Sequence, residues 1–164
     1  MKLYLKEKFF SIGGKFNIYD ENGETKYYAE GEVFSIGRKL HIYNLDGKEV
    51  AFIHQKVLSF LPRFYVYVDG EQVAEIVREF SFFKPVYSIE GPDWKIEGTI
   101  WQHDYEITCG GRNIVSIHKK WFSYVDAYEI DIEDESQEVM ALAVVLAIDF
   151  VLDAGNAAAA NNNN

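Results

Sequence analysis

The longest apolar run of the chain is Val139–Ile148, near the C-terminus. A helix that is apolar on every face must be enclosed on every face, by lipid or by protein. About ten apolar residues in a row are too few to cross a bilayer, which requires roughly twenty. Ser136 is a suitable N-cap, and Gly155 is a residue type that commonly ends a helix. The pattern therefore predicts a helix over residues 136–152 that is buried inside protein.

Residues 1–132 show a different pattern, which is typical of short strands. In Lys39–Tyr43, for example, Leu40 and Ile42 lie on one face of the predicted strand and the other side chains lie on the opposite face. Two kinds of connection alternate between the strands. One is a tight turn rich in Gly and acidic residues, at residues 20–23, 44–47, 69–70, 91–93 and 109–111. The other is a Phe-Ser or Leu-Ser step, usually followed by a base, at residues 10–15, 34–39, 58–63, 80–84 and 122–124.

This repeat predicts a mainly β fold. About six units of two strands give about twelve antiparallel strands, each with one apolar face. An open sheet would leave one side of the buried helix in water, so we expect a closed antiparallel β-barrel around a central hydrophobic C-terminal helix. We expect a single domain over residues 1–153, with its strands in 1–132. Residues 154–164 are rich in Ala and Asn, and we expect them to be a low-complexity tail, linker, tag or disordered end.

Several stretches resemble those of a known family. They are Lys8–Gly13, Phe34–Gly37, Ser59–Pro62, Ile89–Trp94, Lys119–Ser123 and the apolar helix. With them, nearly the whole of residues 1–153 resembles a bacterial-type member of the LURP-one-related family of the tubby-like superfamily. The resemblance implies a closed twelve-stranded barrel around a central hydrophobic helix, and relatives without a settled biochemical activity. Animal tubby proteins of this superfamily bind phosphoinositides, but no such site matches this sequence residue by residue.

The alternating connections also separate the charges. In an antiparallel barrel the tight turns share one end, here termed the turn end, and the other connections share the opposite end, the Phe–Ser end. The predicted acidic residues of the turn end are Asp20, Glu21, Asp46, Asp69, Glu71, Asp93 and residues 131–135. The Phe–Ser end is predicted to form a basic rim of Lys15, Arg38, Lys39, Arg63, Lys84, Lys119 and Lys120. Such a rim fits a phosphate, an anionic lipid headgroup or an acidic protein surface, and it also fits a purely solubilising role.

The net charge of -10 and the pI near 4.8 argue against nucleic acid as a partner, because phosphate binding requires clustered Lys and Arg. The single cysteine, Cys109, excludes a disulfide framework and favours a reducing compartment. Residues 1–8 contain no apolar segment of signal-peptide length, and no transmembrane segment is expected, so we predict a cytoplasmic protein. Because a closed barrel has no free strand edges, we expect a monomer.

Histidines and one buried acid are further candidates for a site. His103 and His118 flank the turn at Cys109 and would face each other across one hairpin, next to Asp104. A zinc site usually needs three or four ligands, so surface histidines are the commoner explanation and no metal is expected. Asp149 is the one charge within the apolar part of the helix. It is either a buried partner in an ion pair or, as is more common, a residue near the barrel mouth that reaches water or a Lys.

Enzyme motifs are missing from the sequence. It lacks the Gly-x-Ser-x-Gly, His-Glu-x-x-His, Cys-x-x-Cys, Walker A and dinucleotide-binding patterns. The predicted helix also fills the lumen in which an active site would form. We therefore expect no enzyme and no cofactor, but a non-catalytic cytoplasmic binding or scaffold module with a protein partner that the sequence does not identify. One alternative is peripheral binding to a membrane, a phosphate or a phospholipid headgroup through the basic rim, and another is an enzyme of unrecognised class.

Overall fold

The computed structural model of the chain describes residues 1–6, 14–32, 35–82, 86–122 and 125–161. Within these ranges lie twelve strands, two short 3-10 helices and one long α-helix. The strands are β1 (Lys2–Lys6), β2 (Lys15–Tyr19), β3 (Thr25–Gly31), β4 (Lys39–Asn44), β5 (Glu49–Gln55), β6 (Arg63–Val68), β7 (Glu71–Glu79), β8 (Val86–Glu90), β9 (Trp94–Thr99), β10 (Asp104–Cys109), β11 (Arg112–Phe122) and β12 (Val125–Ile132). The helices are η2 (Ile100–Gln102), η3 (Glu135–Gln137) and α1 (Glu138–Asn161).

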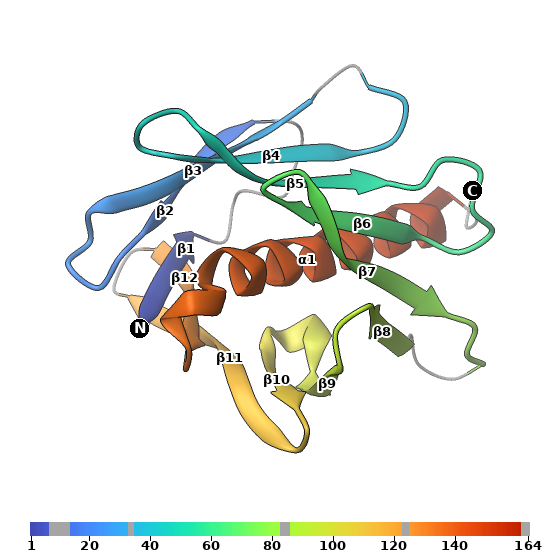
Figure 1. The fold of residues 1–164 in the computed structure, drawn as a ribbon. Helices are drawn as coiled ribbons and strands as arrows, with labels where there is room; N and C mark the ends of the chain where they lie inside the picture. The colour runs from blue at the N-terminus through green and yellow to red at the C-terminus, as the bar shows by residue number, and fades with distance from the viewer. Residues whose placement is uncertain (7–13, 33–34, 83–85, 123–124, 162–164) are drawn as a thin grey trace.

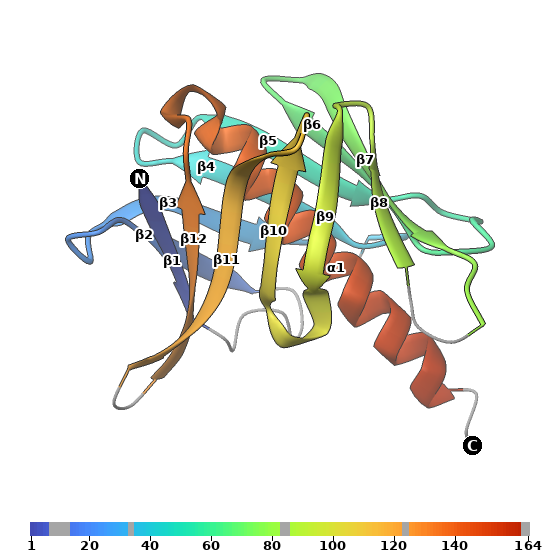
Figure 2. The same cartoon turned by 90° about the horizontal axis from the view of Figure 1, so that it is seen from below.

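The strands form one antiparallel sheet that curls into a nearly closed barrel (Figures 1 and 2). Strands β1 to β8 pair in chain order, as do β9 to β12, and β1 also pairs with β12, so that Leu3 lies opposite Ile130. In the described residues, backbone pairing does not join β8 to β9, the two edges of the sheet, although these strands lie side by side in both views. The predicted mainly β barrel of about twelve strands is confirmed, with a seam between β8 and β9 in place of full closure.

Helix α1 occupies the lumen of this barrel (Figure 1). Each residue of Ala141–Ile148 is at most 1% exposed, so the helix is covered on all of its faces along this stretch. It packs most closely against β5, β6 and β7, where the rings of Phe64 and Phe150 meet edge to face with centroids 5.8 Å apart. The predicted alternation is also present, since Leu40 and Ile42 of β4 are both buried in the core. A helix enclosed by protein is therefore confirmed.

The two ends of the helix differ from the prediction. Ser136 lies inside the short helix η3, and the N-cap of η3 is Asp134, whose carboxylate accepts hydrogen bonds from the backbone N–H and the hydroxyl of Ser136 at 2.9 and 2.7 Å. The short helix η3 follows, so α1 begins at Glu138. At the other end α1 passes through Gly155 to Asn161, so the predicted stop at Gly155 is wrong and residues 154–161 continue the helix. Ala157–Ala160 are strong helix formers, which outweighs the cost of about 1 kcal/mol for one Gly.

The connections alternate between the two ends of the barrel. The β2–β3, β4–β5, β6–β7, β8–β9 and β10–β11 turns lie at the turn end, together with the start of α1. The loop of residues 56–62 and η2 lie at the Phe–Ser end, as do the last turns of α1, which project beyond the strands in Figure 2. Other parts of the Phe–Ser connections, at residues 7–13, 33–34, 83–85 and 123–124, lie outside the described residues.

The enclosure of α1 predicts a large effect of one core substitution. Leu142→Ala removes a fully buried side chain and leaves a cavity inside a surrounding sheet. We expect the free energy of unfolding, measured by urea denaturation, to fall by about 3 kcal/mol. Leu45→Ala in the β4–β5 turn is the matched control, because Leu45 is 67% exposed, and it should cost less than about 0.5 kcal/mol. Equal losses for the two variants would contradict an enclosed helix.

Candidate functional site

The predicted basic rim consists largely of cations that face carboxylates of the same barrel. Five of its seven residues form ion pairs: Lys15 with Glu30 at 3.5 Å, Lys39 with Glu32 at 3.0 Å, Arg63 with Glu75 at 2.6 Å, Lys120 with Glu129 at 3.4 Å, and Arg38 with Asp153. Lys119 lies in β11, and Lys84 lies outside the described residues. The five paired cations are thus divided among five different carboxylates rather than directed at one common point.

The two arginines of the rim hold parts of the barrel together. The Arg63 guanidinium bridges Glu75 of β7 and, at 3.9 Å, Glu90 of β8, and its hydrogen bond with Glu75 raises the pKa of Arg63. Arg38, on the loop before β4, binds Asp153 of α1 and so connects the rim to the helix. Paired carboxylates of this kind offset much of the attraction that the rim would exert on an outside anion.

Lys120 belongs to a cluster on the outer wall. Its partner Glu129 is only 6% exposed and also accepts hydrogen bonds from Lys2 Nζ and the Tyr4 hydroxyl, both at 3.1 Å. Burial alone would raise the pKa of Glu129, but the hydrogen bonds from Lys2 and Tyr4 lower it on balance. Lys120 therefore helps to hold a buried carboxylate between β1, β11 and β12.

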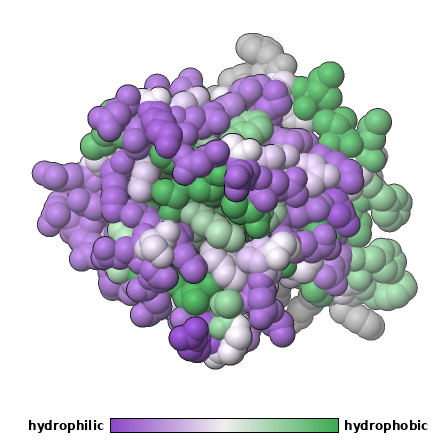
Figure 3. Space-filling view, in the orientation of Figure 1, coloured by the Kyte–Doolittle hydropathy of each residue, from purple (hydrophilic) through white to green (hydrophobic). Residues whose placement is uncertain are grey.

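The described loops of the Phe–Ser end carry a group of exposed apolar side chains, here termed the apolar crown. Its members are Ile36, Val57, Leu58, Phe60, Phe80, Phe82, Val86 and Trp101, whose exposed fractions range from 45% to 100%. Apolar surface gathers at the right-hand end of the molecule in Figure 3, where the loops after β5 and β7 lie in Figure 1. Large exposed apolar groups of this kind commonly mark an interaction surface.

The conformation and the exposure of the crown residues do not stabilise the folded chain. Leu58 is fully exposed. Its φ of 61° lies in the left-handed region, which is unfavourable for a leucine. Phe80 and Phe82 contact each other edge to face, with centroids 5.0 Å apart, and both remain largely exposed. Burying a Leu or Phe side chain contributes about 1.5–3 kcal/mol to stability, and the exposed crown residues do not make this contribution in the isolated chain.

The sequence pattern predicts a role for the bases of these loops and not for their apolar residues. A usable signal was present, because connections normally carry solvated polar residues, whereas Phe60, Phe80 and Phe82 lie within connections. The pattern did not reveal whether these side chains fold back onto the core or point outward. A side chain that folds back contributes to packing, whereas one that points outward is available for binding.

Next to the crown, a buried polar contact fixes η2 to the helix. Asp149 of α1 is 5% exposed, and its Oδ1 lies 3.3 Å from Nδ1 of His103, the residue that follows η2. The His103 ring stacks on Tyr128 with centroids 4.2 Å apart. Burial raises the pKa of Asp149, and the adjacent His103 offsets only part of this effect. Asp149 is therefore a buried partner of a histidine, and the expectation that it reaches water or a Lys is wrong.

Three of the four histidines contact carboxylates, and no carboxylate is shared between two of them. His118 Nδ1 lies 2.8 Å from Asp104 Oδ1, whereas His103 faces the helix. His41 lies between two glutamates of neighbouring segments, at 2.6 and 3.0 Å. Within the described ranges of the chain, no three His, Cys, Asp or Glu side chains are grouped so as to hold a metal ion.

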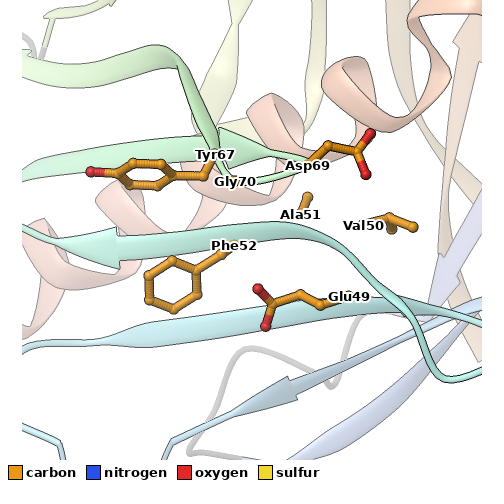
Figure 4. A pocket seen from close by; sticks show the side chains of 7 residues that line it. All are labelled: Glu49, Val50, Ala51, Phe52, Tyr67, Asp69 and Gly70. Carbon is orange, nitrogen blue, oxygen red and sulfur yellow. The ribbon is translucent and has the colours of Figure 1, made fainter.

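A shallow groove of about 160 Å³ lies on the outer wall near the turn end (Figure 4). The residues that line it are Glu49, Val50, Ala51, Phe52, Tyr67, Asp69 and Gly70. Its polar side chains are two carboxylates and one phenol. This set offers contacts to a cation rather than a nucleophile held beside a base.

Comparisons with known proteins agree with this architecture. The LURP-one-related family model matches residues 1–149. The chain belongs to this family. A relative from Bacillus subtilis (strain 168), described as "Uncharacterized protein YxjI", is 34% identical over 152 residues, which cover 93% of this chain and 94% of that protein. An X-ray structure of an Arabidopsis thaliana protein matches with a TM-score of 0.57 over 90% of both chains, and at 16% identity this likeness concerns the fold alone.

Membership in the LURP-one-related family confirms the resemblance found in the sequence. It is consistent with a protein of unknown specific role, and it brings no catalytic assignment or ligand. In the part of the chain that the structure describes, none of the helices has the length and apolar character needed to cross a bilayer.

The contact between Asp149 and His103 predicts a pH dependence of stability in this LURP-one-related protein. Because burial raises the folded-state pKa of Asp149 above its unfolded value of about 4, the folded state favours the protonated carboxyl. The stability that this group contributes is fully present below the unfolded pKa and is lost as the pH rises through the folded pKa. We expect Asp149→Asn to raise the free energy of unfolding at about pH 7 and to change it little at about pH 3. A loss of stability at about pH 7 in urea denaturation would show instead that the ion pair with His103 dominates.

Proposed function

We propose that the protein is a non-catalytic binding module that docks on the lipid interface of a membrane through its apolar crown. The observation that carries this proposal is the exposure of Leu58, Phe60 and Phe82, which are 100%, 92% and 86% exposed on two loops at one end of the barrel. Trp101 lies at the same end and is 48% exposed, and tryptophan is favoured at membrane–water interfaces.

The crown contains enough apolar surface for reversible binding. Each exposed Leu or Phe side chain that leaves water contributes about 1.5–3 kcal/mol, so three inserted side chains contribute roughly 5–9 kcal/mol. Immobilising the protein on a surface costs on the order of 4 kcal/mol or more. The remainder corresponds to weak and reversible association, as is expected for a peripheral protein that inserts loops rather than a spanning helix.

The charges favour apolar insertion over attraction to anionic headgroups. The chain has a net charge of -10, and five of the rim cations are already paired with carboxylates. Binding through the crown should therefore depend little on anionic lipid. The alternative of headgroup or phosphate binding through the basic rim requires a strong dependence on anionic lipid and on salt, and this difference distinguishes the two.

The shape of the crown favours lipid over a protein partner. Its most exposed side chains stand at the tips of separate loops, whereas a stable protein interface buries about 800 Å² of well-packed surface on each partner. The non-catalytic part of the proposal is supported by the position of Ala141–Ile148, which are buried along the centre of the barrel where an active site would otherwise form. A scaffold that binds a protein through the same crown is the second candidate.

Vesicle binding tests the proposal. We expect the wild-type protein to co-sediment with phosphatidylcholine vesicles, and the variant Leu58→Ser, Phe60→Ser, Phe82→Ser to bind at least about tenfold more weakly, because about 1.4 kcal/mol corresponds to tenfold. The three side chains are exposed, so the substitutions should leave the unfolding midpoint nearly unchanged.

Two further variants separate the possible outcomes. Leu45→Ser changes an exposed leucine at the turn end and should bind like wild type. The variant Lys15→Gln, Arg38→Gln, Lys39→Gln, Arg63→Gln should retain most of the binding. Binding that requires anionic lipid and is lost in this second variant would point to the basic rim instead. Equal binding of wild type and the crown variant would contradict membrane docking through the crown.

A further inference from the structure

A strip of aromatic rings crosses the outer wall of the barrel on β3 to β6. It is formed by Tyr28, His41, Tyr43, Phe52, His54, Tyr65 and Tyr67, all of which are partly exposed. Neighbouring rings contact one another, with centroid distances from 4.7 Å for His41 and Phe52 to 6.2 Å for His41 and Tyr43. This aromatic strip is separate from the apolar crown, because it lies on the wall and not on the loops of the Phe–Ser end.

The aromatic strip already holds two ammonium groups of this chain. Lys15 Nζ lies 4.8 Å from the ring centroid of Tyr28, and Lys56 Nζ lies 5.9 Å from that of Tyr65. A cation is attracted to the negative face of an aromatic ring in this geometry. Among the described residues, no Lys or Arg lies over the rings in the middle of the strip, at Phe52 and Tyr67. The strip thus contacts cations where the described chain supplies them, and its middle rings contact other rings of the strip instead.

The groove of about 160 Å³ opens at this middle part (Figure 4). Phe52 and Tyr67 form its aromatic side, and Glu49 and Asp69 lie on either side of Ala51. The two ring centroids are 6.0 Å apart, which is too close for a planar group to enter between them. A ligand in the groove therefore lies along the rings, with a carboxylate on each side of its path.

Both carboxylates retain acceptor capacity. Glu49 Oε2 contacts His41 at 2.6 Å, and Asp69 Oδ1 accepts a hydrogen bond from Lys48 at 2.7 Å. Each carboxylate has a second oxygen, and an ionised carboxylate accepts several hydrogen bonds. The pair of Lys48 and Asp69 is 66% and 63% exposed, so it is weak and exchanges readily. A cation that enters the groove meets two anionic groups without breaking a buried contact.

We propose that this groove binds the guanidinium group of an arginine side chain on a basic protein segment. A planar guanidinium can lie along Phe52 and Tyr67 and donate hydrogen bonds to carboxylates at its edge, whereas the ammonium of a lysine acts as a point charge. The net charge of -10 attracts a basic segment and repels an acidic one. The groove lies near the turn end, so it stays accessible when the crown is occupied, and the proposal does not depend on membrane docking.

Titration of the full chain with a blocked peptide, acetyl-Gly-Arg-Gly-amide, tests this proposal by NMR. We expect the backbone amide signals of Phe52, Tyr67 and Gly70 to shift with a Kd in about the millimolar range. The same peptide with citrulline in place of arginine keeps the shape and removes the charge, and its affinity should be at least about tenfold lower. Glu49→Gln and Asp69→Asn should each weaken binding of the arginine peptide roughly three- to fivefold, and raised salt should weaken it further.

Matched variants keep the outcome specific. Glu106→Gln removes the same charge from an exposed position in β10, outside the groove, and should leave the Kd unchanged within about twofold. Phe52→Leu keeps an apolar side chain but removes the ring, and it should weaken binding about threefold. The proposal is overturned if Phe52, Tyr67 and Gly70 do not shift, if the citrulline peptide binds equally well, or if Glu106→Gln and Glu49→Gln have the same effect.

Discussion

The enclosure of helix α1 sets the width of the barrel around it. Ala141–Ile148 are apolar on every face and nearly without contact to water, so the surrounding sheet has to be wide enough to contain a helix. A barrel of about eight strands would be filled by its own side chains, whereas twelve strands leave a wider lumen. Small inward residues such as Ala29, Ala51 and Ala74, each at most 2% exposed, let the wall approach the helix. The helix occupies the lumen, so both proposed binding surfaces lie on the outside of the barrel, one at the Phe–Ser end and one on the outer wall.

The outer surface is divided between charged pairs and apolar loops. Five bases of the predicted rim are paired with acids from neighbouring strands or from α1, as Lys15 is with Glu30 and Arg38 with Asp153. These contacts give the wall of the barrel a locally balanced charge despite the net charge of -10. The loops beyond the wall carry exposed apolar side chains such as Leu58, Phe60 and Phe82. The Phe–Ser end therefore carries exposed apolar side chains next to five bases that are paired with acids.

The sequence predicted the architecture well because burial patterns are local. The apolar run of α1 and the alternation in strands such as β4 can be recognised without knowing any partner. The ends of α1 were harder, since the competition between Asp134 and Ser136 for the cap, and the passage through Gly155, depend on backbone geometry and on the residues beyond. The contacts at the candidate sites were even less predictable from the sequence. Arg38 and Asp153 are 115 positions apart, and Asp149 meets His103 only because the barrel closes around the helix, so no local pattern shows either contact.

The position of α1 after all twelve strands has a consequence for biosynthesis. Lys2 of the first strand lies opposite Asp131 of the last strand, so β1 and β12 cannot pair along their full length until residue 131 has been made. The residues that fill the lumen follow only after that point. At about 5–20 residues per second, a growing chain of this length spends roughly ten to thirty seconds with the inner faces of its strands uncovered. The pairing of β1 with β12 and the filling of the lumen by α1 are therefore late events of synthesis. Until they occur, the inner faces of the strands are open to chaperones.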